Sequence, residues 1–147
     1  LIMERRNFTK NCCGIALAAP FVGLLDSCTS IYYATATGEG GKLIVKKSDF
    51  SYIKNDIQKT RDYVFVKQTD QDFPICLYKQ DENIYFASLM FCTHQGCKTS
   101  LKGDRYVCPC HGAEFSNTGK VLQGPANTNL KTFKTTTDNE NIYIHLV

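Results

Sequence analysis

The sequence lacks a charge excess of either sign, and this absence argues against one large class of functions. Its 147 residues carry 17 Lys and Arg against 14 Asp and Glu, a formal net charge of +3. A nucleic-acid-binding domain usually concentrates basic residues on one face, whereas here the two signs are interspersed along the chain. We therefore expect no nucleic-acid partner.

The chain also lacks the long apolar runs and the periodicity that other architectures need. The apolar run from Cys12 to Leu25 is about fourteen residues long, and a membrane-spanning helix needs about twenty. No long stretch keeps a 3.6-residue period and no internal repeat is present. A chain of 147 residues is enough for one domain with its own core, and a second domain is not expected.

Short segments rich in β-branched and aromatic residues recur between turn signals, which is typical of an all-β chain. Hairpin connections are expected at 81–83, 102–104 and 136–141, and a helical turn within 48–56. Alternation along 83–91 leaves both faces largely apolar, which predicts a strand buried on both sides and leading into Cys92. The expected strands are 42–47, 62–68, 74–80, 83–91, 105–109 and 141–147.

The first part of the chain has the order of features found in an export signal. Arg5 and Arg6 begin a pattern that resembles a twin-arginine signal, and the apolar run that follows suits a signal h-region. The run ends in LLDSC, which resembles a lipobox ending at Cys28. We expect residues 1–27 to be the signal and Cys28 a lipidated N-terminus; an uncleaved membrane anchor and an ordinary cytosolic start are the alternatives.

The segment after Cys28 differs in composition from the rest of the chain. Residues 29–42 are small, polar and rich in Gly and Thr, which is typical of a linker. We therefore expect a tether over 28–41 and the folded domain over 42–147.

Four of the eight cysteines and two of the three histidines crowd into CTHQGC at 92–97 and CPCHG at 108–112. Such a crowd indicates either a metal site or a disulfide framework. One residue separates Cys92 from His94 and two separate Cys108 from His111, so each box offers one thiolate and one imidazole. Zinc accepts such ligands, but zinc fingers usually have two or more residues between paired ligands, which argues against zinc.

The two boxes resemble the C-T-H-x-G-C and C-x-C-H-G boxes of Rieske iron–sulfur proteins, over about residues 74–130. This resemblance implies a [2Fe–2S] cluster in which Cys92 and Cys108 hold one iron and His94 and His111 the other. It also implies an antiparallel β-sandwich or barrel with a small cluster-binding subdomain of two loops.

The resemblance gives roles to further residues in and near the boxes. In the respiratory branch of the family the cysteines matching Cys97 and Cys110 form a disulfide that clamps the two loops. Ferredoxins of ring-hydroxylating oxygenase systems generally lack this pair, and an exported protein can keep the bond. Gly124 and Pro125 resemble the loop that shields the cluster.

The sequence departs from the respiratory pattern after the second histidine. Where high-potential members have G-S-x-Y, this chain has Gly112, Ala113, Glu114 and Phe115. The family's Ser and Tyr hydroxyls donate hydrogen bonds to cluster sulfurs, which favours the reduced state. Without these two bonds we expect a potential lower by on the order of 100 mV or more, which favours menaquinol over ubiquinol as the donor.

We therefore expect the electron-transfer subunit of a quinol oxidoreductase of the cytochrome bc type, with cytochrome b and a c-type cytochrome as partners. It would be attached through its N-terminus to the periplasmic face of a bacterial inner membrane, and would not be catalytic alone. The alternatives are the small Rieske subunit of an exported molybdenum oxidoreductase resembling arsenite oxidase, and a free-standing electron carrier. His145 and Cys76 are expected to be structural.

Overall fold

A computed structural model of the chain describes residues 31–68 and 71–146. Within them lie fourteen strands and one short 3-10 helix, η1 (Lys47–Phe50), so the all-β prediction is confirmed. None of the helices in these described residues has the length and apolarity to cross a membrane. The expected signal over 1–27, with Arg5 and Arg6, and the expected lipidation site Cys28 lie outside the described residues.

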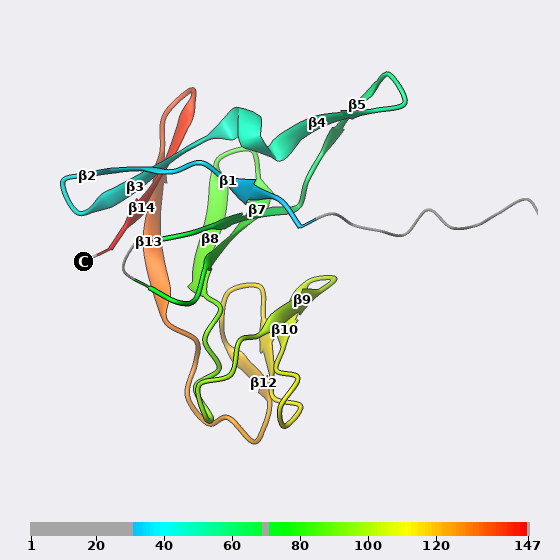
Figure 1. Ribbon diagram of the computed structural model, residues 1–147, viewed down its shortest axis with the longest axis vertical. Coiled ribbons are helices and arrows are strands. Elements are labelled where there is room, and N and C mark those ends of the chain that lie inside the picture. The colour runs from blue at the N-terminus through cyan, green and yellow to red at the C-terminus, as the bar shows by residue number, and fades with distance from the viewer. Residues whose placement is uncertain (1–30, 69–70, 147) are drawn as a thin grey trace, which may run out of the picture. The chain divides into compact units, whose positions relative to one another are not determined.

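The larger sheet has eight strands, and Figure 1 shows it strongly curled. All neighbouring strands pair antiparallel except β1 and β6, which pair in parallel. In spatial order the strands are β1 (Tyr33–Ala34), β6 (Tyr63–Val66), β7 (Ile75–Asp81), β8 (Ile84–Leu89), β13 (Thr132–Thr137), β14 (Asn141–His145), β3 (Lys42–Lys46) and β2 (Thr37–Glu39).

Two smaller sheets complete the described fold. The four-stranded sheet lies beyond the end of β8 in Figure 1, and the two-stranded ribbon follows η1 and projects from the larger sheet. The four-stranded sheet runs β12 (Val121–Gln123), β11 (Glu114–Ser116), β10 (Arg105–Val107) and β9 (Ser100–Lys102), and the ribbon pairs β4 (Ser51–Lys54) with β5 (Ile57–Thr60).

The core is divided into two clusters, and β8 contributes to the first and leads into the second. Tyr85 and Ala87 belong to the first cluster, whose residues come mostly from strands of the larger sheet. Met90 and Cys92, which follow β8, belong to the second cluster beneath the four-stranded sheet. The strand predicted over 83–91 therefore leads from one core cluster into the other, as expected, but it is buried on both sides only in part, because Ile84 is exposed and Phe86 is half-buried.

The six strands expected from the sequence correspond to β3, β6, β7, β8, β10 and β14, and the three expected hairpin turns connect strands as predicted. The expected helical turn is η1. The sequence analysis did not single out β4, β5, β9, β11, β12 or β13. These strands are three to six residues long and mostly polar, so alternation gives little signal in them.

The structure extends the folded domain into the segment expected to be a tether over 28–41. Its residues 33–34 and 37–39 form β1 and β2, at the two edges of the larger sheet. Ala34 is buried in the first core cluster, and the Tyr32 hydroxyl donates to the Asp49 carboxylate at 3.0 Å. The small polar composition that favours a linker is equally compatible with short edge strands, so the domain begins before Lys42.

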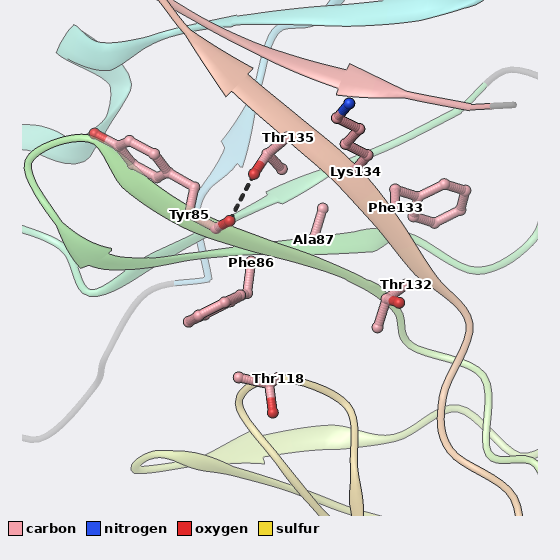
Figure 2. Close-up of a pocket in the computed structure, with 8 residues that line it drawn as sticks. All are labelled: Tyr85, Phe86, Ala87, Thr118, Thr132, Phe133, Lys134 and Thr135. Atoms are coloured by element: carbon pink, nitrogen blue, oxygen red, sulfur yellow. Dashed lines mark hydrogen bonds between the residues drawn. The ribbon is translucent and has the colours of Figure 1, made fainter.

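An open cleft of about 320 Å³ lies between β8, β13 and the turn that joins β11 to β12. Figure 2 shows Thr118 of that turn facing Phe86 and Thr132 across it, and Thr135 donating to the Tyr85 carbonyl at 2.7 Å. None of the cysteines or histidines of the two boxes lines it. This cleft is therefore not the candidate functional site.

Gly119 lies where the four-stranded sheet approaches the larger sheet, and its replacement tests that contact. Its φ is +81°, and an added Cβ would lie 2.9 Å from Thr132 Cγ2 and 3.3 Å from Ser88 Oγ. Gly103 also has a positive φ, +60°, but nothing lies within 4 Å of its added Cβ. We expect Gly119→Ala to lower the free energy of unfolding by about 2–5 kcal/mol, and Gly103→Ala by only about 1–2 kcal/mol.

Urea unfolding of the two variants, followed by circular dichroism, measures this difference. Equal losses in Gly119→Ala and Gly103→Ala would contradict a close contact between the two sheets at this point.

Candidate metal centre

The first box is a loop closed by two backbone hydrogen bonds. The Cys92 N–H donates to the Cys97 carbonyl at 2.8 Å, and the Gly96 N–H donates back to the Cys92 carbonyl at 2.9 Å. Gly96 has φ +78°, a conformation that favours glycine because it has no Cβ. The loop thus holds its first cysteine at a fixed position after β8.

The second box repeats this arrangement with the same residue offsets. The Cys108 N–H donates to the Ala113 carbonyl at 2.8 Å, and the Gly112 N–H donates back to the Cys108 carbonyl at 3.0 Å. Gly112 has φ +74° and occupies the same loop position as Gly96. Two loops of one design therefore each present a cysteine at their first position and a histidine within the turn.

The first cysteines of the two loops are brought together in the second core cluster. Cys92 and Cys108 are 0% and 2% exposed, and both are free thiols. Burial raises the pKa of the Cys92 thiol, the neighbouring Cys108 thiol raises it further, and backbone N–H groups of His94 and Gln95 lower it. The two sulfurs are therefore adjacent, buried and already faced by backbone donors.

The two box histidines also meet. The His94 and His111 rings lie with their centroids 5.0 Å apart and nearly perpendicular, at 87°. His94 Nδ1 is buried without a hydrogen-bond partner, whereas His111 is exposed. A buried polar atom without a partner is rare in native proteins and calls for an explanation, and a metal ligand is one.

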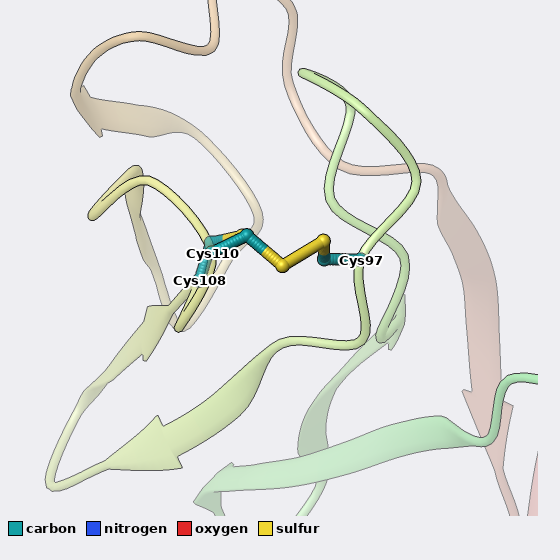
Figure 3. Close-up of side chains that lie close together, drawn as sticks. All are labelled: Cys97, Cys108 and Cys110. Atoms are coloured by element: carbon teal, nitrogen blue, oxygen red, sulfur yellow. A yellow bond between two sulfur atoms is a disulfide. The ribbon is translucent and has the colours of Figure 1, made fainter.

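The remaining box cysteines form the disulfide that the resemblance implied. Cys97 and Cys110 are joined with S–S 2.02 Å and Cα atoms 6.6 Å apart. Cys108 lies beside this bond, so that its sulfur and the two disulfide sulfurs all fall within 4.8 Å of one another (Figure 3). Two members of this trio are already bonded to each other, so the trio is not itself a metal site.

The donor set and its spacing favour a two-iron centre over a single zinc ion. Four ligands around one tetrahedral zinc lie about 3–4 Å from one another, given bonds of about 2.0–2.3 Å. Among the described residues, no three of Cys92, His94, Cys108 and His111 place their donor atoms within 4.8 Å of one another. Two neighbouring buried thiols and two neighbouring imidazole rings match the ligand types of a Rieske centre.

A family model described as the Rieske [2Fe-2S] domain matches residues 50–134, more than half of the chain. The chain belongs to this family. Its cofactor is a [2Fe–2S] cluster, as the sequence predicted, and the buried thiols and the unpartnered His94 nitrogen fit that group.

Relatives of the chain include iron-sulfur subunits of cytochrome b6-f complexes. The cytochrome b6-f complex iron-sulfur subunit of Prochlorococcus marinus is 38% identical over 55 residues, which are 36% of this chain and 31% of that subunit. The corresponding subunit of Trichodesmium erythraeum is 49% identical over 41 residues, 26% of this chain and 23% of that subunit. The matched segment is thus less than a third of each of these two relatives.

One solved structure is similar over most of its length. The cyanobacterial plasma membrane Rieske protein PetC3 from Synechocystis PCC 6803 is 35% identical with a TM-score of 0.50, covering 56% of this chain and 85% of that one. This similarity confirms the Rieske fold expected from the sequence.

A third loop of the Rieske domain, residues 124–130, is tied to both boxes. The Thr93 hydroxyl donates to the Thr128 carbonyl of this loop at 2.5 Å. Gln123, the last residue of β12 just before the loop, donates its side-chain amide to the Gly112 carbonyl at 3.3 Å. Gly124 and Pro125 are exposed, and their shielding role stays a prediction. The sequence analysis missed Thr128 and Gln123, since a backbone acceptor and a lone amide leave no motif.

The positions expected to tune the cluster are buried beside its cysteines. Ala113 and Phe115 are both 0% exposed and share the second core cluster with Cys92 and Cys108. Neither carries a hydroxyl, so neither donates a side-chain hydrogen bond to a cluster sulfur. This placement supports the predicted tuning role, which stays a prediction.

Loss of the disulfide is expected to weaken the Rieske site without removing a ligand. Cys97→Ser opens a cross-link between residues 13 apart, which costs about 3 kcal/mol of stability for a loop of this size. We expect Cys97→Ser to bind less cluster than the wild type and to lose it faster. The decay of the visible absorbance measures this loss.

The double variant with Cys97→Ser and Cys110→Ser should be no worse than either single variant, because all three lose the same bond. Unchanged cluster lifetime in Cys97→Ser under oxidising conditions would show that the clamp has no role in holding the cluster.

Two other residues have the structural roles expected of them. Cys76 is fully buried in the second core cluster, and burial raises the pKa of its thiol to about 12, so it stays protonated. His145 lies on β14, where its Nε2 is 2.9 Å from the Thr136 hydroxyl. Neither belongs to the metal centre.

Proposed function

We propose that Cys92 and Cys108 bind one iron and His94 and His111 the other, and that the chain transfers electrons as the Rieske subunit of a bc-type quinol oxidoreductase. One observation carries the proposal: two loops with the same hydrogen-bonded frame bring two buried thiols and two histidine rings together. A [2Fe–2S] cluster with two imidazole ligands supplies one-electron transfer at a higher potential than an all-cysteine cluster.

The histidines form the contact surface for the redox partner. His94 directs its buried Nδ1 inward as the ligand atom, which leaves Nε2 on the outer edge of the ring. His111 is exposed on the neighbouring loop. Each outer ring nitrogen could accept a proton from a bound quinol as the quinol gives up an electron, or donate a hydrogen bond to an oxygen of a bound quinone.

The cysteine side of the site is kept dry by the second core cluster. Met90, Tyr106 and Phe115 are nearly or fully buried with the two ligand thiols, which excludes water from the sulfurs. Backbone N–H groups of His94 and Gln95 face Cys92 and are placed to donate to its sulfur. Electrons therefore enter and leave on the histidine side.

The partners are proposed from the relatives and from the disulfide. The curated relatives are subunits of cytochrome b6-f complexes, which supports cytochrome b and a c-type cytochrome as partners. The Cys97–Cys110 bond supports the respiratory branch over the ring-hydroxylating ferredoxins. Ala113 and Phe115 favour a low-potential donor, menaquinol.

Reduction by a quinol tests this function directly. We expect a menaquinol analogue to bleach the visible absorbance of the oxidised protein, with a potential within roughly −150 to +300 mV. A potential near about −400 mV, typical of plant-type ferredoxins, together with no reduction by the quinol, would contradict the proposal.

The N-terminal residues support a place at the periplasmic face of the inner membrane. Arg5 and Arg6 would direct export of the folded protein, and Cys28 would carry the lipid that holds it to the membrane. Fractionation of cells producing Cys28→Ser tests the anchor. Release into the periplasm is the expected result, and continued membrane attachment would favour an uncleaved signal anchor instead.

A further inference from the structure

Cys108 is both a proposed cluster ligand and a neighbour of the disulfide. Its sulfur lies within 4.8 Å of the sulfurs of Cys97 and Cys110, which are bonded to each other (Figure 3). Cys92 is equally buried and equally free but does not belong to this set. A free thiol beside a disulfide is the arrangement that thiol–disulfide exchange requires.

We propose that Cys108 rearranges the disulfide whenever the protein is without its cluster. The Cys108 sulfur attacks the Cys97 sulfur, a bond forms between these two, and the bond from Cys97 to Cys110 breaks. Cys110 leaves as a thiolate and takes up the proton that Cys108 gave up. One disulfide replaces another, so no oxidant or reductant is consumed.

Attack on Cys97 is favoured over attack on Cys110. A bond from Cys108 to Cys110 would close a small ring across Pro109 alone, which strains disulfide geometry. A bond to Cys97 instead keeps the two box loops joined. The thiol that is released, Cys110, occupies an exposed position, where added reagents reach it.

In this proposal the bound cluster protects the Cys97–Cys110 disulfide from exchange. While Cys108 holds iron its sulfur is not available to attack, so the clamp stays intact. Once the cluster is lost, exchange ties up a ligand in a disulfide, and reloading then needs the reverse exchange, in which the Cys110 thiolate attacks Cys97 and releases Cys108, or an added reductant. The inference rests on the proposed function in one respect, the assignment of Cys108 as a ligand.

Two matched variants test the exchange. Cys92→Ser and Cys108→Ser each remove one buried proposed ligand, and only the first keeps the attacking thiol. Both are incubated without reductant, alkylated with iodoacetamide and digested for mass spectrometry. We expect Cys110 to be labelled in Cys92→Ser and to stay unlabelled in Cys108→Ser. Because alkylation is irreversible, even a minor rearranged form accumulates as labelled protein.

Equal labelling of Cys110 in both variants, or none in either, would overturn the proposal. Wild-type protein stripped of iron by a chelator gives a second measurement that does not depend on a variant. In it we expect a peptide that links Cys97 to Cys108, with Cys92 remaining a free thiol. Links to Cys92 as abundant as links to Cys108 would indicate scrambling in an unfolded chain and would also overturn it.

The wild-type protein before stripping separates this inference from the proposed function. If Cys108 holds iron, Cys110 is not labelled until the chelator is added. Labelling at the same level before and after stripping, with the same linked peptide, would remove Cys108 from the ligand set while the exchange itself stands.

Discussion

Replacing His94 with alanine is expected to give protein that contains no [2Fe–2S] cluster. Its Nδ1 is buried and has no hydrogen-bond partner. Two other described residues of these types lie outside the boxes: Cys76, whose burial raises the pKa of its thiol to about 12 so that it stays protonated, and His145, which lies on β14 beside the Thr136 hydroxyl. The same loss is expected for His111→Ala. Iron and acid-labile sulfide analysis of the purified variants, with their visible spectra, measures the effect.

His145→Ala is the matched control, because it removes an imidazole from β14 and leaves the boxes unchanged. It should keep the cluster in full. Full cluster content in His94→Ala would show that this histidine is not a ligand and would break the assignment of both boxes.

Restoring hydroxyls at Ala113 and Phe115 is expected to raise the reduction potential. Both side chains are buried with the proposed ligand thiols, and a hydroxyl donor stabilises the reduced cluster more because reduction adds negative charge there. Each bond is worth about 1–2 kcal/mol, so Ala113→Ser with Phe115→Tyr should lie roughly 80–170 mV above wild type at ~59 mV per 1.4 kcal/mol. Protein-film voltammetry at a single pH measures the shift.

Ala87→Ser is the control for this series, since it adds a hydroxyl at a buried position of the first core cluster. Its potential should equal that of the wild type. If the double variant also stays at the wild-type potential, these two positions do not face the cluster, and the preference for menaquinol loses its support.

The strands that position the site were predictable because they are rich in β-branched and aromatic residues and lie between turn signals. Tyr85 and Ala87 of β8 pack in the first core cluster, and Met90, just after β8, packs in the second. The edge strands β1 and β2 could not be predicted, because short polar strands at a sheet edge have the composition of a linker. Only their pairing with β6 and β3 distinguishes them from a linker.

The site was predictable to the level of residue type and spacing. The resemblance of the two boxes to those of Rieske proteins implied the four proposed ligands and the disulfide pair. The common frame of the two loops and the contact from Thr93 to the Thr128 carbonyl depend on backbone groups that every residue has, so the sequence carries little trace of them. The same holds for the approach of Cys108 to the disulfide, which depends on how the loops pack.

Electron paramagnetic resonance of the reduced, purified protein, combined with metal and sulfide analysis, tests the central claim most directly. We expect two irons and two acid-labile sulfides per chain, and a signal whose average g value lies clearly below that of an all-cysteine [2Fe–2S] ferredoxin, because two nitrogen ligands bind one iron. One zinc per chain with no labile sulfide, or a signal typical of four cysteine ligands, would contradict the account.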